Sequence, residues 1–414
     1  MTGTAGDYRH LAPQLIATVE DAAIGLKGYV VVDTTVQGRS CGGVRMFDDV
    51  CLDEIKGLAR SMTLKYGFNG MAQGGAKAGI VADPEMPTEQ KRRILRRWGE
   101  ITAPLMTSRA YITGTDMNVW QGDIDAVHAA AGFKEPAPRR TKGRKSGLFT
   151  AYGVMVVTEA AAAFKGLDLS RCSVAVEGFG AVGSAYAMLM AQRKGARVVA
   201  ISTTKGAIYN PAGLDVEKLL ALKQQLGNSL VEDYDAAERI DPRELLTLDV
   251  DLLAPCARIH SIDETNAQRI RAPIVCPGAN IPVTRRAAQI LFERGVVSVP
   301  DFTANWGGVL GNKLEALGVS DDYVEAFFRK KNKHRILDLL SKAEARRKPL
   351  VEIAEGYALA RFARIKRQAE TKSAKGYLKG LALRLFNSGV FPEVVYRPLA
   401  PAYFDRALGR DEAI

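Results

Sequence analysis

The fold of this chain is decided by the stretch Ser173-Val-Ala-Val-Glu-Gly178-Phe179-Gly180-Ala181-Val182-Gly183. It begins with residues typical of a buried strand, which lead into a GxGxxG pattern and then into a helical pattern. A second strand pattern follows at 196–202. Glycines in this order let a pyrophosphate approach the helix N-terminus, where unpaired N–H groups and the helix dipole favour negative charge. The stretch predicts a Rossmann domain that binds a dinucleotide through residues 178–183.

The end of the second strand indicates which dinucleotide is bound. An acidic residue that binds the ribose is expected about 20 residues past the last glycine. The sequence there is Ser202-Thr203-Thr204-Lys205, so Thr203 stands where the acid is expected. A carboxylate would repel a 2′-phosphate, whereas a hydroxyl next to a lysine tolerates one. The cofactor is expected to be NAD or NADP, and Thr203 favours NADP.

A second informative stretch is Met71-Ala-Gln-Gly74-Gly75-Ala-Lys77-Ala-Gly-Ile80, which contains a lone lysine among small residues. Adjacent glycines allow a ligand to come close to the backbone. Desolvation lowers the pKa of such a lysine, so that Lys77 can take a proton from water. Lys65 ends a helical pattern over 52–65, and this second cation could hold a carboxylate in the same pocket. The alternative is two surface lysines beside a tight turn.

Several motifs together resemble the glutamate, leucine, phenylalanine and valine dehydrogenases, and the leucine and phenylalanine branch more closely than glutamate dehydrogenase. They are Arg39–Met46, Met62–Lys65, Gly74–Lys77 and Ala82–Pro84, and the resemblance continues to about residue 315. It implies an enzyme that oxidatively deaminates an L-amino acid to the 2-oxo acid and ammonia, or catalyses the reverse, with NAD or NADP. It also implies a homo-oligomer.

The resemblance implies individual roles. Lys77 would activate water, Asp116 would move a proton to the departing amine, and Lys65 would pair with the α-carboxylate of the substrate. In isolation, Asp116 is better explained as a cap of the following segment. The other substrate contacts are expected at Gly74, Gly75, Asn305, Cys41, Val309 and Asn312. The other cofactor contacts are expected at Thr150, Ala257 and Asn280.

Cys41 bears on the substrate. In glutamate-specific members of the family a lysine directly precedes the Gly-Gly-x-Arg segment, and here that position is Cys41; a serine that assists it corresponds to Asn312. A thiol cannot offset the cost of desolvating a second carboxylate, so an apolar or aromatic substrate is expected. Three alternatives remain open: a cation from the linker at Arg139–Lys145 replaces the lysine, the substrate is an amino-acid derivative, or the chain is a non-catalytic binding or regulatory protein.

The sequence predicts an α/β protein of two domains with a C-terminal extension. Residues 1–135 are expected to form the substrate-binding and oligomerisation domain, beginning with a helical pattern at residue 12. A basic linker with two prolines follows, and 146–320 are expected to form the Rossmann domain. Residues 321–414 are expected to form a basic helical segment that packs back on the first domain, plus an extension.

Composition narrows the class of protein. The chain has 414 residues, of which 47% are hydrophobic and 25% charged, as in ordinary globular proteins. No signal peptide or membrane span is recognisable, so a cytoplasmic protein without a membrane partner is expected. Five scattered cysteines indicate neither disulfides nor a metal site. The segment from Arg329 to Arg384 contains 17 Lys and Arg but only 5 Asp and Glu, which accounts for the net charge of +11. The rest of the chain is close to neutral, so nucleic acid is an unlikely partner.

Overall fold

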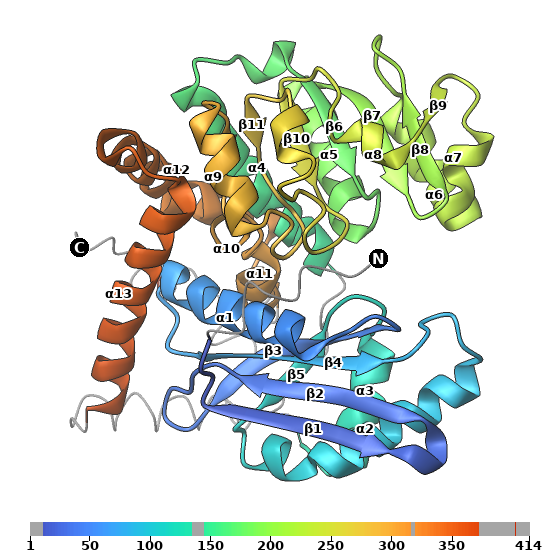
Figure 1. The fold of residues 1–414 in the computed structure, drawn as a ribbon, viewed down its shortest axis with the longest axis vertical. Helices are drawn as coiled ribbons and strands as arrows, with labels where there is room; N and C mark the ends of the chain where they lie inside the picture. The colour runs from blue at the N-terminus through green and yellow to red at the C-terminus, as the bar shows by residue number, and fades with distance from the viewer. Residues whose placement is uncertain (1–10, 135–144, 316–318, 372–401, 403–414) are drawn as a thin grey trace. The chain divides into compact units, whose positions relative to one another are not determined.

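The computed structural model describes residues 11–134, 145–315, 319–371 and residue 402, and these divide into two units (Figure 1). Unit 1 holds the described residues up to 134 together with those from Tyr357 to 371. Unit 2 holds the described residues between 145 and 356 and residue 402. Most of the predicted linker and of the C-terminal extension lies outside the described residues.

Unit 1 is built on a five-stranded sheet in the order β1-β2-β4-β3-β5. β1 and β4 are antiparallel to β2, whereas β3 is parallel to β4 and β5. The strands are β1 (Leu15–Asp21), β2 (Leu26–Val32), β3 (Ser40–Phe47), β4 (Gly74–Val81) and β5 (Ile112–Thr115). The helical pattern predicted from residue 12 is wrong, because Leu15–Asp21 pairs with β2 as an edge strand of alternating exposure. Pairing with β2 overrides the local pattern.

Helices cover both faces of this sheet. They are α1 (Leu52–Asn69), α2 (Thr88–Thr107) and α3 (Gln121–Ala130). Ala78 and Ile80 of β4 pack with Trp98 of α2, whereas Gly79 between them faces Ile55 of α1. Successive residues of a strand point to opposite faces. One face of the sheet therefore carries the apolar core with α2 and α3, and the other face lies under α1 (Figure 1).

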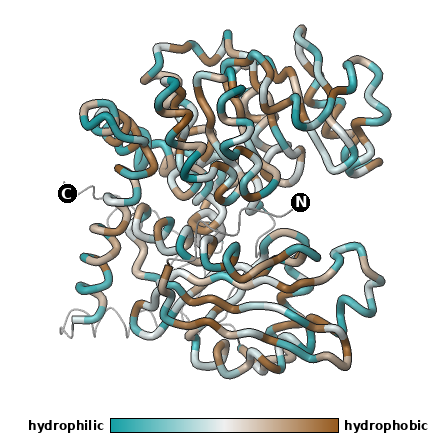
Figure 2. The backbone as a smooth tube through the Cα atoms, in the orientation of Figure 1, coloured by the Kyte–Doolittle hydropathy of each residue, from teal (hydrophilic) through white to brown (hydrophobic). Residues whose placement is uncertain are grey.

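Unit 2 is built on a seven-stranded sheet in the order β12-β11-β10-β6-β7-β8-β9. The strands from β12 to β7 are parallel, and β8 and β9 continue the sheet in antiparallel fashion. They are β6 (Ser173–Glu177), β7 (Arg197–Thr203), β8 (Gly206–Tyr209), β9 (Glu238–Ile240), β10 (Leu252–Pro255), β11 (Ile274–Val275) and β12 (Val297–Ser298). The central strands of this sheet are largely hydrophobic (Figure 2). The order confirms the predicted Rossmann-like domain.

The helices of unit 2 include one that is almost entirely apolar. They are α4 (Ser146–Phe164), α5 (Ala181–Lys194), α6 (Val216–Leu226), α7 (Leu230–Asp233), α8 (Pro242–Leu245), α9 (Arg285–Glu293), α10 (Asp301–Ala304), α11 (Gly307–Glu315) and α12 (Asp321–Arg346). By length and composition α4 would suffice to cross a membrane, but 78% of its apolar window is buried. It is the central helix that packs against α5, α11 and α12.

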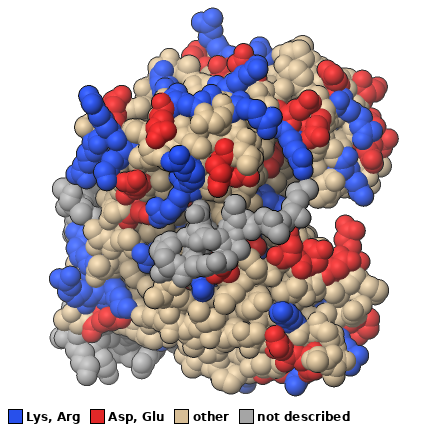
Figure 3. All heavy atoms as spheres, in the orientation of Figure 1, with Lys and Arg blue, Asp and Glu red and all other residues tan. Residues whose placement is uncertain are grey.

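The described part of the predicted third segment, 321–414, is divided between the two units. α12 packs on α4 of unit 2, so only the later part of the predicted segment contacts unit 1. Its Phe328 meets the Trp306 ring at 4.4 Å between centroids, so Trp306 is a core residue of unit 2. α13 (Leu350–Glu370) reaches unit 1, where Arg361 Nη1 donates to Phe68 O at 2.8 Å. Lys and Arg side chains gather over α12 and α13 (Figure 3).

Candidate active site

A cluster of reactive side chains lies on unit 1. Lys77 is on β4 and Asp116 directly follows β5, with β3 between these strands. Lys77 Nζ lies 2.9 Å from Asp116 Oδ2, and the two side chains are only 4% and 11% exposed. The Asp116 carboxylate therefore pairs with buried cations and does not cap a helix. The structure brings together the two residues predicted to be catalytic, and their role in turnover stays a prediction.

Arg45 and Glu54 complete the cluster, and sequence reasoning missed both. Arg45 Nε donates to Asp116 Oδ2 at 2.8 Å, and Arg45 Nη1 donates to Glu54 Oε1 at 2.6 Å. The result is a buried row of alternating charges, Glu54–Arg45–Asp116–Lys77, with no formal net charge. The sequence carried only a weak signal, because Arg45 stands two residues after the Gly42-Gly43 pair and Glu54 lies in the helical pattern over 52–65.

Burial is the largest influence on the pKa of both central groups. For Lys77 burial lowers the pKa, the charge of Asp116 opposes that change and the charge of Arg45 adds to it, and the net shift is downward. For Asp116 burial raises the pKa, but the charges of Arg45 and Lys77 outweigh it and hold the pKa well below its usual range. An ionised carboxylate therefore stands beside a lysine that gives up its proton more readily than a lysine in water.

Arg45 is expected to set the pH range of activity through Lys77. We compare Arg45→Met in a Glu54→Gln background with Glu54→Gln alone, so that Glu54 is not left as an unpaired buried carboxylate, while Asp116 keeps Lys77 as its partner. A base must be unprotonated, so activity falls as pH drops through the pKa of Lys77. Without Arg45 that pKa rises, and the acidic limb of the kcat/KM profile should move to higher pH. An unmoved limb would show that Arg45 only supports the fold.

Glycines of β3, β4 and β5 lie near this cluster. A Cβ on Gly43 of β3 would lie 2.9 Å from Asp116 Cβ, whereas a Cβ on Gly114 of β5 would meet nothing within 4 Å. No described residue therefore fills the position beside Gly114. Gly74 and Gly75 have a packing role, because a Cβ there would overlap the backbone of Thr34 and Thr63 respectively.

The amides of these two glycines are already engaged. Gly74 N donates to Arg39 O at 3.3 Å, and Gly75 N donates to Thr34 Oγ1 at 3.4 Å. The close backbone packing explains the glycine pair without a ligand. Their predicted contact with a substrate carboxylate stays a prediction.

Lys65 and Cys41 also belong to unit 1. Lys65 is 4% exposed on α1, the helix that packs directly on β4. Cys41 pairs with Gly75 of β4 and with Ile112 of β5. Because strand residues two apart share a face, Cys41 lies on the same face as Arg45 and beside the strands that carry Lys77 and Asp116.

The glycine motif of unit 2 has the conformation that a dinucleotide requires. Gly178 has φ +86°, and a Cβ there would come within 2.9 Å of Ala257. A Cβ on Gly183 would overlap Gly178 O, so this glycine allows α5 to approach the strand. A Cβ on Gly180 would meet nothing within 4 Å, which leaves open space at the helix N-terminus. The three glycines thus fit the turn, the close packing and the approach expected of a pyrophosphate site, and their contact with a cofactor stays a prediction.

The other residues of unit 2 that were predicted to bind the cofactor differ in their hydrogen bonding and exposure. Thr203 Oγ1 donates to Asn228 O at 2.7 Å and accepts from Lys205 N at 3.1 Å, so much of its hydrogen-bonding capacity is used within the loop. Thr150 Oγ1 donates to Ser146 O at 2.8 Å within α4. Ala181, which is exposed, and Val182, which is half-buried, are the first two residues of α5. Phe179 is buried beneath the loop.

Asn305 carries an unused acceptor. It is 5% exposed, and its Nδ2 donates to Ala279 O at 2.8 Å and to Asn280 Oδ1 at 3.1 Å. Its Oδ1 is buried without a hydrogen-bond partner among the described residues. A buried acceptor without a donor is costly, which favours a bound ligand that donates to it. Val309 lies one turn later on α11, and Asn312 is on the same helix.

Glu177, which sequence reasoning passed over, directly precedes Gly178. Burial raises its pKa to about 7, although Ser261 Oγ donates to its carboxylate at 2.8 Å and acts in the opposite direction. Glutamate in the unfolded chain has the ordinary pKa of 4.5. Between these two values the folded state binds more protons than the unfolded state, so stability falls as pH rises.

Glu177→Gln is expected to remove that loss, which amounts to about 3 kcal/mol above pH 7. The amide keeps the shape of the side chain and can still accept from Ser261. The urea midpoint of the wild type should fall from pH 5 to pH 8 by more than the midpoint of the variant does. The exposed Glu217 on α6 provides the control, Glu217→Gln. Parallel pH dependence in all three proteins would contradict the assignment.

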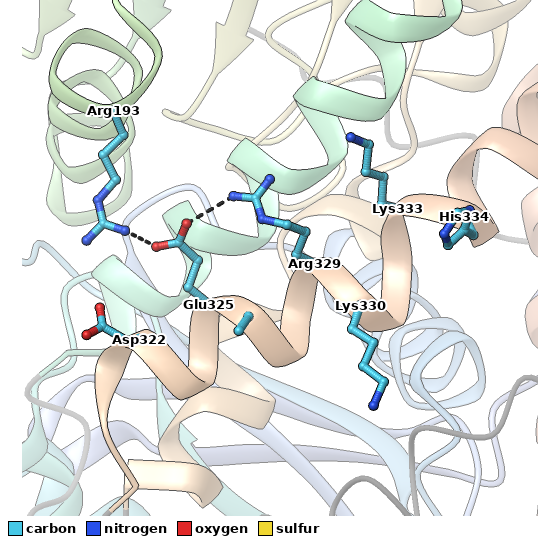
Figure 4. A pocket seen from close by; sticks show the side chains of 8 residues that line it. Arg193, Asp322, Glu325, Arg329, Lys330, Lys333 and His334 are labelled. Carbon is cyan, nitrogen blue, oxygen red and sulfur yellow. Dashed lines mark hydrogen bonds and ion pairs between the residues drawn. The ribbon is translucent and has the colours of Figure 1, made fainter.

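A separate pocket of about 510 Å³ lies between α5 and α12 (Figure 4). Within it, Glu325 accepts from Arg193 and, at 3.0 Å, from Arg329. Arg193 is at the C-terminal end of α5, whereas the glycine motif is at its N-terminal end. The pocket therefore lies at the other end of α5 from the predicted dinucleotide site.

Comparisons with known proteins cover both units. The model of the "Glu/Leu/Phe/Val dehydrogenase, dimerisation domain" matches residues 15–131, and that of "Glutamate/Leucine/Phenylalanine/Valine dehydrogenase" matches residues 144–371. A glutamate dehydrogenase of Thermotoga maritima is 38% identical over 303 residues, which is 70% of this chain and 71% of the relative. The NADP-specific glutamate dehydrogenase A1 of Halobacterium salinarum is 36% identical over 291 residues, or 67% and 69% of the two chains.

Solved structures have the same architecture. The hetero-hexameric glutamate dehydrogenase from Thermus thermophilus, in its leucine-bound form, is 29% identical with a TM-score of 0.73, covering 87% of this chain and 91% of that one. The L-tryptophan dehydrogenase from Nostoc punctiforme, at 22% identity and a TM-score of 0.60 over 86% and 98% of the two chains, shares the fold. With both units matched, the chain belongs to the glutamate, leucine, phenylalanine and valine dehydrogenase family of amino acid dehydrogenases.

Proposed function

We propose that this chain catalyses the oxidative deamination of an L-amino acid to the 2-oxo acid and ammonia, or the reverse reaction. The observation that carries the proposal is the buried contact of 2.9 Å between Lys77 Nζ and Asp116 Oδ2. A lysine of lowered pKa beside an ionised carboxylate combines a base and a proton carrier. A nicotinamide dinucleotide, when bound, supplies the acceptor for the hydride that leaves the substrate Cα.

Each side chain has one task in this proposal. Lys65 pairs with the α-carboxylate and fixes the position of Cα. Loss of hydride leaves an imine, and Lys77 removes a proton from the water that attacks the imine carbon. Asp116 takes up the proton that Lys77 removed from the water and passes it to the nitrogen of the resulting carbinolamine. The nitrogen then departs as ammonia, and loss of the hydroxyl proton to Lys77 leaves the 2-oxo acid. The free Oδ1 of Asn305 accepts a hydrogen bond from substrate or cofactor.

The proposed substrate has an apolar or aromatic side chain. Cys41 lies beside Gly75 and Ile112, where it offers no positive charge to a second carboxylate. Val309 and Asn312, which are on α11 of unit 2, stay predicted substrate contacts. Glutamate is the second candidate, because the curated relatives described above are glutamate dehydrogenases.

NADP is the proposed cofactor. The end of β7 carries Thr203 in place of an acid, with Lys205 next to it, so no carboxylate at this position opposes a 2′-phosphate. One of the relatives is NADP-specific by name.

A homo-oligomer formed through unit 1 is also proposed. A dimerisation-domain model matches residues 15–131. Within that range β1 is an edge strand, and Ile16 on it is 44% exposed. Edge strands with exposed apolar side chains favour pairing with another chain.

A screen of the twenty amino acids with NAD and with NADP tests the function. Reduction of cofactor by an apolar or aromatic amino acid, with equal release of ammonia, is expected. Dinucleotide binding without turnover of any of the twenty would instead favour an amino-acid derivative. The absence of both binding and turnover would contradict the proposal.

A further inference from the structure

Lys223 on α6 touches the glycine motif, although it lies far from the motif in sequence. Its Nζ donates to Gly180 O at 2.6 Å and to Ser184 Oγ at 2.7 Å. The ammonium also lies 5.4 Å from the centroid of the Phe179 ring. A single cation thus contacts the middle glycine, the residue before it and the first turn of α5.

The ammonium of Lys223 is partly buried without a carboxylate partner among the described residues. Its hydrogen-bond acceptors are neutral, and within the described part of the chain no ion pair to Lys223 is formed. It stands at the N-terminal end of α5, where the helix dipole also places positive charge. Burial lowers the pKa of Lys223 to about 8, in keeping with a cation that lacks a counter-charge.

Room for an anion exists at the same place. Gly180 is exposed, and among the residues that the structure describes, nothing lies within 4 Å of a Cβ placed on it and no side chain caps the N-terminus of α5. An anion in that space would accept from the backbone N–H groups of α5 and stand next to the ammonium. It would thereby offset two adjacent positive regions at once.

We infer that Lys223 binds the pyrophosphate of the dinucleotide and contributes directly to its affinity, an inference that rests on the proposed function. The pyrophosphate is favoured over the 2′-phosphate because Lys223 bonds the middle glycine of the motif, whereas Thr203 and Lys205 occupy the end of β7. The competing explanation is a structural tie, in which Lys223 only fastens α6 to the glycine loop through hydrogen bonds.

Binding measured by calorimetry, without turnover, separates these roles. The variants are Lys223→Met, which loses charge and donor, and Lys223→Gln, which keeps a donor without charge. Both should weaken NADH and NADPH equally, by about ten- to a hundredfold, and should reduce the salt dependence of binding. Lys218→Met is the control, because Lys218 lies on the same helix, is 46% exposed and pairs with Asp235 at 2.9 Å; it should bind as the wild type does.

Three results would overturn the inference. Wild-type affinity in Lys223→Gln would show a hydrogen-bonded tie, loss confined to NADPH would place the 2′-phosphate there, and no loss in either variant would show no role. Thermal unfolding of each variant identifies any that fails to fold. Lys223→Gln is the milder substitution, so it can still test the inference if Lys223→Met does not fold. A wild type that binds neither dinucleotide would instead count against the proposed function itself.

Discussion

Replacing Lys77 with methionine is expected to lower kcat by at least about a thousandfold, because acid–base groups of this kind contribute up to about 10⁴-fold. Dinucleotide affinity should be unchanged, since the glycine motif belongs to unit 2. Lys77→Arg is the sharper variant. Arginine keeps the positive charge and a donor for Asp116, but it stays protonated and cannot act as a base.

Lys77→Arg should therefore be as inactive as Lys77→Met, and Asp116→Asn should be inactive as well. Lys27→Met is the matched control, because Lys27 is exposed on the neighbouring strand β2. Recovery of turnover in Lys77→Arg to within tenfold of the wild type would mean that Lys77 supplies only charge to Asp116.

The second large effect concerns the substrate. Wild-type kcat/KM for glutamate is expected to be far below that for leucine, valine, phenylalanine or tryptophan, because desolvating an unpaired carboxylate costs several kcal/mol. Cys41→Lys should raise kcat/KM for glutamate relative to leucine by about a hundredfold or more, which corresponds to roughly 3 kcal/mol of restored charge pairing.

Cys51→Lys is the matched control, because Cys51 is exposed just before α1. It should leave the ratio of the two substrates unchanged. Glutamate as the best wild-type substrate would contradict the apolar pocket and would favour the activity that the names of the relatives suggest.

Local sequence was sufficient to predict the structure where a single segment determines its own conformation. The strand, glycine motif and helix from Ser173 onward form a contiguous unit. In the structure each glycine of the motif has the surroundings that the pattern requires. Lys77 and Asp116 were singled out from separate segments, and their contact depends on β3 lying between β4 and β5. That strand order is a property of the whole sheet, so no local pattern fixes it.

The misses have the same physical origin. β1 was mistaken for helix because its pairing with β2 comes from tertiary structure. Arg45, Glu177 and Lys223 were overlooked because burial and partners give each its chemistry, and these depend on segments distant in sequence. The packing of α12 on α4 was not predicted, because an apolar stripe shows that a helix is buried, but not which surface covers it.

The most direct test of the account is hydride transfer from the amino acid itself. The best substrate from the screen, labelled with deuterium at Cα, is mixed with enzyme and the oxidised cofactor, and the reduced cofactor is analysed by mass spectrometry. The account predicts one deuterium in each reduced cofactor molecule, with one ammonia released per turnover and neither product formed by Lys77→Met. Reduced cofactor without deuterium, or ammonia released without cofactor reduction, would contradict it.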